Sequence, residues 1–321
     1  ALVMAVFIVS MAIAHTFLDF IPSIFLGAPD ENSFLSILPG HQLLLKGNGY
    51  AAVIFTLYGS LLGIIISLAF IPFFMIFLPL LYDKIQMFMA PILVIISLLL
   101  IRSEEKGKRL MALFIFVSAG FLGIGALNLN LKEPLLPLFT GLFGASALLI
   151  SIKQKTEVPQ QQIVSLTSIR LSKKSLVKSS GAAIISAPFT AFLPGLGASQ
   201  AALVGKTIMN VKDQREFLCL MGAINVIVMI LSFVTLAAIG KMRTGAAVAV
   251  YRLLPEITPS SLFTLMFAMI ISGIISCGLA IIIAKNIAVN VNKIPYEKIS
   301  RATLLFLLLL VIIFTDLSLK G

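Results

Sequence analysis

Two polar stretches interrupt the apolar sequence of this chain, and both carry residue types that bind anions. The first spans residues 25–33 and includes Gly27, Pro29, Asp30, Asn32 and Ser33; the second spans residues 192–200 and includes Pro194, Gly195, Gly197, Ser199 and Gln200. In a bilayer core, non-helical backbone survives only where it is buried in protein or lines a cavity. Transporters place substrate sites at such broken helices. We therefore predict that these residues bind substrate.

In the second stretch, Gly195 and Gly197 would let backbone N–H groups approach an anion, and the next helix N-terminus would add positive partial charge. Ser199 and Gln200 would add side-chain hydrogen bonds. The alternative is a Pro/Gly kink that lets helices pack closely. In the first stretch, Asp30 would bind a proton, a sodium ion or the substrate; its alternative role is an N-cap for the next helix.

Three further polar side chains could act on an anion or a coupling ion. His15 and Asp19 are four residues apart, so on a helix they share one face, as a proton relay requires. Arg243 could hold a carboxylate or phosphate through two hydrogen bonds. The alternatives are a hydrogen-bonded packing role for His15 and, for Lys241 with Arg243, a pair that extends towards water from a helix end.

The composition identifies the elements that position these residues as membrane helices. Mean hydropathy is +1.09, and only 12% of the 321 residues are charged. Apolar runs long enough to cross a bilayer are expected at roughly residues 1–17, 51–72, 86–101, 110–128, 134–151, 216–239, 261–284 and 302–317. The predicted fold is therefore an all-α polytopic membrane protein. The chain starts inside an apolar run without Met, so we expect that a segment upstream is missing.

The net charge of +11 comes from short loops and does not indicate nucleic-acid binding. By the positive-inside rule, the basic loops 102–109, 153–178 and 285–301 are predicted to be cytoplasmic, in a multi-pass protein of the cell membrane. The two His and two Cys form no recognisable catalytic or metal-binding motif. We therefore expect no enzyme activity, no metal and no cofactor other than Na⁺ or H⁺ as a coupling ion.

A long polar segment divides the chain into two membrane halves. We predict a first repeat at residues 1–150, a cytoplasmic linker at 151–175 and a second repeat at 176–321. Glycine-led polar turns near residues 27 and 240 recur in the two halves and fall on opposite faces of the predicted topology. This arrangement is typical of inverted-repeat transporters with re-entrant or broken helices.

Several motifs together resemble the large permease of tripartite tricarboxylate transporters, in its shorter archaeal branch. They are HTFLDFIPSIFLGAPD at 15–30, LPGH at 38–41, KGNGY at 46–50, FLPGLGAS at 192–199 and KMRTGAAVAV at 241–250. The resemblance covers nearly the whole chain. The family's first Pro-Gly loop is absent, and the 240–245 segment stands where the bacterial proteins carry another Gly-x-Pro-Gly loop. Tricarboxylate specificity is therefore not carried over from the resemblance.

These observations favour a secondary transporter for a small organic anion such as a carboxylate, driven by an ion gradient. Substrate would bind between residues 27–33 and 194–200. The alternative is a translocase for a lipid-linked phosphate carrier, with Lys241, Arg243 and Arg252 neutralising phosphate. An intramembrane enzyme ranks below both. Expected partners are the anion and the lipid bilayer; a homodimer, a binding protein and a small membrane subunit remain open.

Overall fold

The computed structural model describes residues 1–25, 34–128, 138, 140–146, 149, 152, 158–193, 196–291, 302, 304, 305 and 309. Helices make up most of this part of the chain, and it contains no strand. The helices are α1 (Leu2–Leu18), α2 (Phe20–Phe25), α3 (Phe34–Leu45), α4 (Gly49–Ser103), α5 (Arg109–Leu127), the π-helix η1 (Thr140–Ala145), α8 (Lys173–Phe192), α9 (Ala198–Ile208), α10 (Gln214–Ile239), α11 (Gly245–Leu253) and α12 (Pro259–Asn290).

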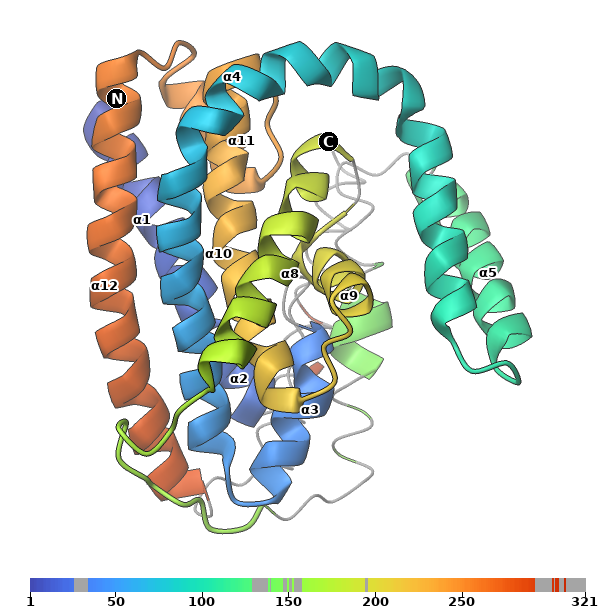
Figure 1. Cartoon of the computed structure of the whole chain (residues 1–321), viewed down its shortest axis with the longest axis vertical. Helices are drawn as coiled ribbons and strands as arrows, with labels where there is room; N and C mark the ends of the chain where they lie inside the picture. The colour runs from blue at the N-terminus through green and yellow to red at the C-terminus, as the bar shows by residue number, and fades with distance from the viewer. Residues whose placement is uncertain are drawn as a thin grey trace.

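Five segments are long and apolar enough to cross a bilayer. They are Leu2–Phe25, Gly49–Leu80, Arg109–Leu127, Gln214–Ile239 and Pro259–Asn290. This confirms the predicted all-α polytopic membrane class. The predicted spans at 51–72 and 86–101 belong to one continuous helix, α4, which bends over at one end of the molecule and runs back (Figure 1). The predicted spans at 134–151 and 302–317 lie largely outside the described residues.

The centre of the fold is α10, which is buried along most of its length. It packs against α4 on one side and α8 on another, while α1 packs against α12 (Figure 1). Elements of both predicted halves are therefore interleaved in one bundle. The division into two repeats, and their inverted symmetry, remain predictions.

Glycines bring α4 and α10 into backbone contact. A Cβ atom added at Gly59 would lie 1.8 Å from the carbonyl oxygen of Cys219, and one at Gly222 would lie 2.0 Å from that of Thr56. Gly63, four residues after Gly59, has the carbonyl oxygen of Ala223 at 2.6 Å from its added Cβ. Small residues at this spacing let membrane helices approach closely. The interface between α4 and α10 therefore depends on the absence of side chains at these positions.

The second part of α4 and all of α5 form a two-helix arm beside the bundle (Figure 1). Large apolar side chains cover its surface; Leu110 is 79% exposed and Phe121 is 73% exposed. Such exposure is ordinary for a helix that faces lipid, because lipid tails are as apolar as the side chains themselves. The arm therefore agrees with a membrane location.

Helix α8 ends at Phe192 and α9 begins at Ala198, and the two helices pack against each other as a hairpin. Gly205 of α9 lies against α8: a Cβ atom added there would be 2.9 Å from the carbonyl oxygen of Ala182 and 2.7 Å from the Ser186 hydroxyl. α9 has 11 residues, about 16 Å of helix, which is too short to cross a bilayer. This hairpin supplies the broken helix predicted for residues 192–200.

The polar segment after residue 157 is fastened to the bundle. The Gln161 side chain accepts a hydrogen bond from the Gly49 N–H (2.8 Å) and donates one to the Leu44 carbonyl (3.0 Å). The Tyr58 hydroxyl donates to the carbonyls of Leu166 (3.2 Å) and Ile169 (3.0 Å). This segment therefore holds the start of α4 in place. The cytoplasmic location of the basic loops remains a prediction.

Candidate functional site

A cavity of about 510 Å³ lies among α1, the α8–α9 turn, α10 and the start of α11. It is the cavity with the most polar lining of those described. Its polar side chains are His15, Thr190, Ser232, Arg243 and Thr244, and its backbone contributors include Leu196, Gly197 and Gly245. Two segments that the sequence singled out separately, 194–200 and 241–245, therefore contribute to one site.

Arg243 reaches the cavity from the loop between α10 and α11. α10 ends at Gly240, whose left-handed conformation (φ 65°) is one that glycine adopts without strain. The turn after Gly240 places Arg243 at the cavity and starts α11 two residues later. Arg243 is half-buried, and burial lowers the pKa of its guanidinium below its usual value. Arginine remains charged in proteins, so the cavity carries a fixed positive charge.

Two helix N-termini border the same cavity. Thr244 is the N-cap of α11: its Oγ1 accepts a hydrogen bond from the Ala247 N–H (3.2 Å) and lies 2.7 Å from the Ser232 hydroxyl. Gly197 is the N-cap of α9 and has no side chain to cap the first turn. Helix N-termini carry positive partial charge and point N–H groups outward. Together with Arg243, they make this cavity suited to an anion.

His15 lines the cavity from α1, and Asp19 lies one helical turn further along. Asp19 is buried, 6% exposed, and its Oδ2 accepts a hydrogen bond from the Asn225 amide (2.8 Å). The same amide lies 3.4 Å from the Thr16 carbonyl oxygen. Asn225 lies near the middle of α10, so this pair sits deep in the bundle. Carboxyl groups are rare at such depth in membrane helices, so the role of Asp19 as a coupling residue stays a prediction.

The structure brings His15, Gly197 and Arg243 of the predicted site together at the cavity. Ser199 is fully buried in α9, and the Gln200 Oε1 accepts a hydrogen bond from the Gly197 N–H (3.0 Å), a helix-capping contact. Neither is among the residues that line the cavity, and their role in binding remains a prediction. Gly27, Pro29, Asp30, Asn32, Ser33, Pro194 and Gly195 lie outside the described residues.

Sequence reasoning missed four polar contributors, Thr190, Ser232, Thr244 and Asn225. Three of them are hydroxyl residues, which are common in membrane helices and often donate a hydrogen bond to their own backbone. Thr190, for example, donates to the Ala187 carbonyl (2.7 Å). Only Asn225 carried a signal, because an amide in the centre of an apolar span needs a hydrogen-bond partner. In the structure that partner comes from the 15–19 segment of the first half: Asn225 bonds to Asp19.

The fold is that of a polytopic membrane protein, and the cavity is lined by an arginine and two helix N-termini. The chain belongs to the family described as "Tripartite tricarboxylate transporter TctA family", whose model matches residues 1–319. It is therefore a member of a transporter family and not an enzyme. The resemblance stated from its motifs is confirmed.

An archaeal protein is similar to this chain along most of its length. An uncharacterized protein of Methanocaldococcus jannaschii is 30% identical over 313 residues, which is 96% of this chain and 76% of the relative. No solved structure matches the chain. The relative's description assigns no substrate, so the site itself must carry the functional argument.

Proposed function

We propose that this protein is a secondary transporter that carries a small organic anion, such as a carboxylate, across the membrane. The observation that carries the proposal is the meeting of Arg243 with the N-termini of α9 and α11 at one cavity. A guanidinium can hold a carboxylate through two parallel hydrogen bonds. The helix ends would bind a second oxyanion without any further charged side chain.

The proposed site includes Gly197 and Arg243 of the predicted set. Substrate binds between the end of α8, the start of α9 and the α10–α11 loop, in a cavity that His15 also lines. Residues 27–33 keep their predicted role, and they lie outside the described residues. Seven polar or glycine positions from four elements line one cavity. A rigid-body movement of any of these elements would therefore change how easily substrate reaches the cavity.

The coupling ion is proposed to act at Asp19. Its carboxyl group is buried beside Asn225 and one turn from His15, which faces the substrate cavity. A proton that neutralises Asp19, or a sodium ion that replaces the Asn225 contact, would change the charge one helical turn from the substrate. This arrangement couples the occupancy of the two sites electrostatically, because charges in a poorly hydrated interior are weakly screened.

The family membership favours a soluble anion over a lipid-linked phosphate. The family is described by tricarboxylate transport, and Arg252, which the lipid-carrier hypothesis required, is exposed on α11 and is not among the cavity-lining residues. Because the family is described as tripartite, we propose that the chain works with an extracytoplasmic binding protein and a small membrane subunit.

The test is a binding titration of the purified protein with di- and tricarboxylates, comparing wild type with Arg243→Gln. Loss of one hydrogen bond to a charged group should weaken binding by about 10–150-fold. Arg252→Gln is the matched control: it removes the same charge from α11 and should leave affinity unchanged. Equal affinity in wild type and Arg243→Gln, or binding of polyprenyl phosphates alone, would contradict the proposed site.

The coupling proposal is tested in proteoliposomes with an imposed proton or sodium gradient. Asp19→Asn keeps the shape of the side chain but removes the titratable group. We expect binding of the anion to persist while gradient-driven accumulation is lost. Accumulation at the wild-type rate in Asp19→Asn would show that the coupling ion binds elsewhere.

A further inference from the structure

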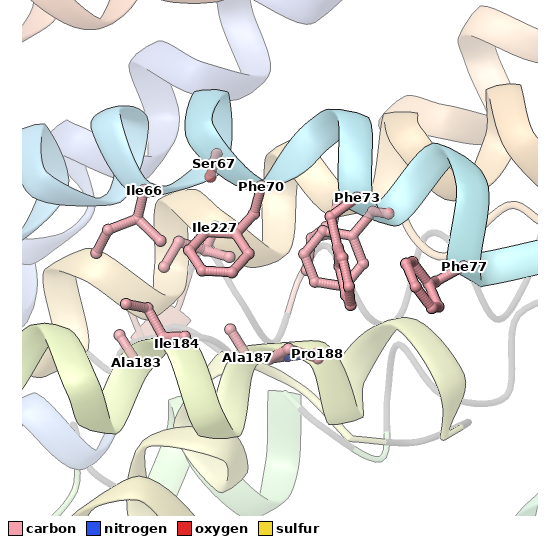
Figure 2. A pocket seen from close by; sticks show the side chains of 12 residues that line it. Ile66, Ser67, Phe70, Phe73, Phe77, Ala183, Ile184, Ala187, Pro188 and Ile227 are labelled. Atoms are coloured by element: carbon pink, nitrogen blue, oxygen red, sulfur yellow. The ribbon is translucent and has the colours of Figure 1, made fainter. Parts of the chain in front are cut away.

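A second cavity lies beside the anion cavity, between α4 and α8. It has a volume of about 180 Å³, and its walls are almost entirely apolar. Figure 2 shows Phe70, Phe73 and Phe77 pointing from α4 towards α8, where Ala187 and Pro188 form the facing wall. We call this space the aromatic annex, defined by these five residues together with Ser67.

The aromatic annex adjoins the anion cavity at Leu231. This residue of α10 lines both spaces and is 1% exposed. On α8 the annex ends at Pro188, and the anion cavity begins two residues later, at Thr190. Leu231 and the end of α8 are therefore shared borders of a charged space and an apolar one.

Ser67 is a buried polar residue in the wall of the annex. Its side chain is 3% exposed, and among the described residues its Oγ has no hydrogen-bond partner. An unsatisfied buried hydroxyl costs free energy, and serines in membrane helices usually bond to their own backbone. Because the oxygen itself is covered, the surface that the annex offers to a ligand is apolar.

From this adjacency we infer that the substrate is an amphipathic organic anion, whose carboxylate binds near Arg243 and whose aromatic or alkyl group occupies the aromatic annex. The inference rests on the proposed function and specifies its substrate class. An apolar protein cavity of about 150 Å³ holds a benzene molecule, so the annex can take one aromatic ring or a short alkyl chain. A tricarboxylate, which is polar throughout, would leave it empty.

The phenylalanines also explain why the annex would prefer a ring. The rings of Phe73 and Phe77 stack with centroids 4.1 Å apart, and Phe73 meets Phe74 edge to face at 5.8 Å. Phe70 meets Phe73 edge to face at 6.4 Å. A row of rings offers both faces and edges to a further ring, an arrangement favoured over unpaired burial.

The experiment is a binding titration of purified wild-type protein with monocarboxylates of increasing chain length, together with an aryl carboxylate and a short dicarboxylate. Affinity should rise by about fourfold for each methylene that enters the annex and then level off when it is full. The aryl carboxylate should bind at least about tenfold more tightly than acetate. Equal affinity across the series would overturn the inference.

Two variants separate this inference from the proposed function. Ser67→Leu fills the annex and should abolish the gain with chain length, while short-dicarboxylate affinity stays at the wild-type value. Ser97→Leu, on the same helix but away from both cavities, is the matched control and should keep the gain. Leu231→Ala widens the shared border of the two cavities and should extend the gain to longer chains.

The results distinguish the two failures. If short dicarboxylates bind and chain length has no effect, the annex inference is wrong and the proposed function stands. If no carboxylate binds at all, the proposed function fails first. A co-purifying phospholipid that fills the annex, and that amphipathic anions do not displace, would assign the space to lipid and overturn the inference.

Discussion

Replacing Gly222 by alanine should separate the two central helices. The added Cβ atom would lie 2.0 Å from the Thr56 carbonyl oxygen and 3.1 Å from the Ser60 nitrogen. Ordinary contact begins near 3.4 Å, so α4 and α10 would have to move apart by about 1.4 Å, which forfeits much of their dispersion attraction. Because the obstacle is backbone, no side-chain rotation can relieve it.

The magnitude follows from this geometry. Overpacking a core typically costs about 1–3 kcal/mol, and we expect Gly222→Ala at the upper end because it disturbs the largest helix interface of the fold. A cost of about 3 kcal/mol corresponds to a fall in melting temperature of roughly 6–12 °C. Gly278→Ala is the matched control: nothing lies within 4 Å of its added Cβ. It should be neutral or gain up to about 1 kcal/mol of helix propensity.

The two cysteines provide the assay. Cys219 and Cys277 are both free and buried, so a thiol-reactive fluorescent dye in detergent reports unfolding without any added label. The dye should react at a lower temperature in Gly222→Ala than in wild type or Gly278→Ala. If Gly222→Ala and Gly278→Ala melt together at the wild-type temperature, the close α4–α10 crossing is wrong.

Three further predictions concern protonation and buried polar contacts. Burial lowers the pKa of His41. Its contribution to stability is therefore present above the unfolded pKa of about 6.5 and is lost as the pH falls through the folded pKa. The melting temperature should accordingly vary less between about pH 5 and about pH 8 in His41→Gln than in wild type. Asn225→Leu removes a donor from the buried Asp19 carboxyl and should cost about 1.5–3 kcal/mol, read by the same dye assay; an unchanged melting temperature would argue against the 2.8 Å contact. Thr244→Val removes the α11 N-cap; it should cost about 1 kcal/mol of stability and weaken carboxylate binding. The control Thr258→Val, which removes the exposed α12 cap, should affect stability alone. Equal effects of the two variants on binding would show that the α11 N-terminus does not contribute to the site.

The sequence was informative wherever one residue type has few physical solutions. Continuous apolar runs fixed the membrane class, because nothing else explains their length. Pro194 with the flanking glycines predicted a break in the helix, and α8 indeed ends at Phe192 while α9 begins at Ala198. The sequence also indicated Arg243, since a guanidinium can hold a carboxylate or phosphate through two hydrogen bonds.

The sequence was less informative about which interrupted helices come together at one cavity. The prediction paired the 194–200 stretch with residues 27–33, which lie outside the described residues, so that pairing stays a prediction; that Gly197 shares a cavity with both Arg243 and His15 was not predicted. Such pairings depend on helix order around the bundle, which hydropathy does not encode. Small polar residues such as Ser232 could not be predicted as cavity residues for the same reason, because only helix packing decides whether a hydroxyl faces its own backbone or a cavity.

By itself, then, the sequence determined the class of the protein, its broken helices, its transporter family and the charged residues worth testing. These follow from local chemistry: hydropathy, backbone flexibility and motif spacing. Only the tertiary structure decided that two helix N-termini and Arg243 share one cavity, that Asn225 bonds Asp19, and that an aromatic annex adjoins the site at Leu231. The physical reason is that these features bring together residues up to 228 positions apart, such as His15 and Arg243, which line one cavity, and such proximity is set by how helices pack.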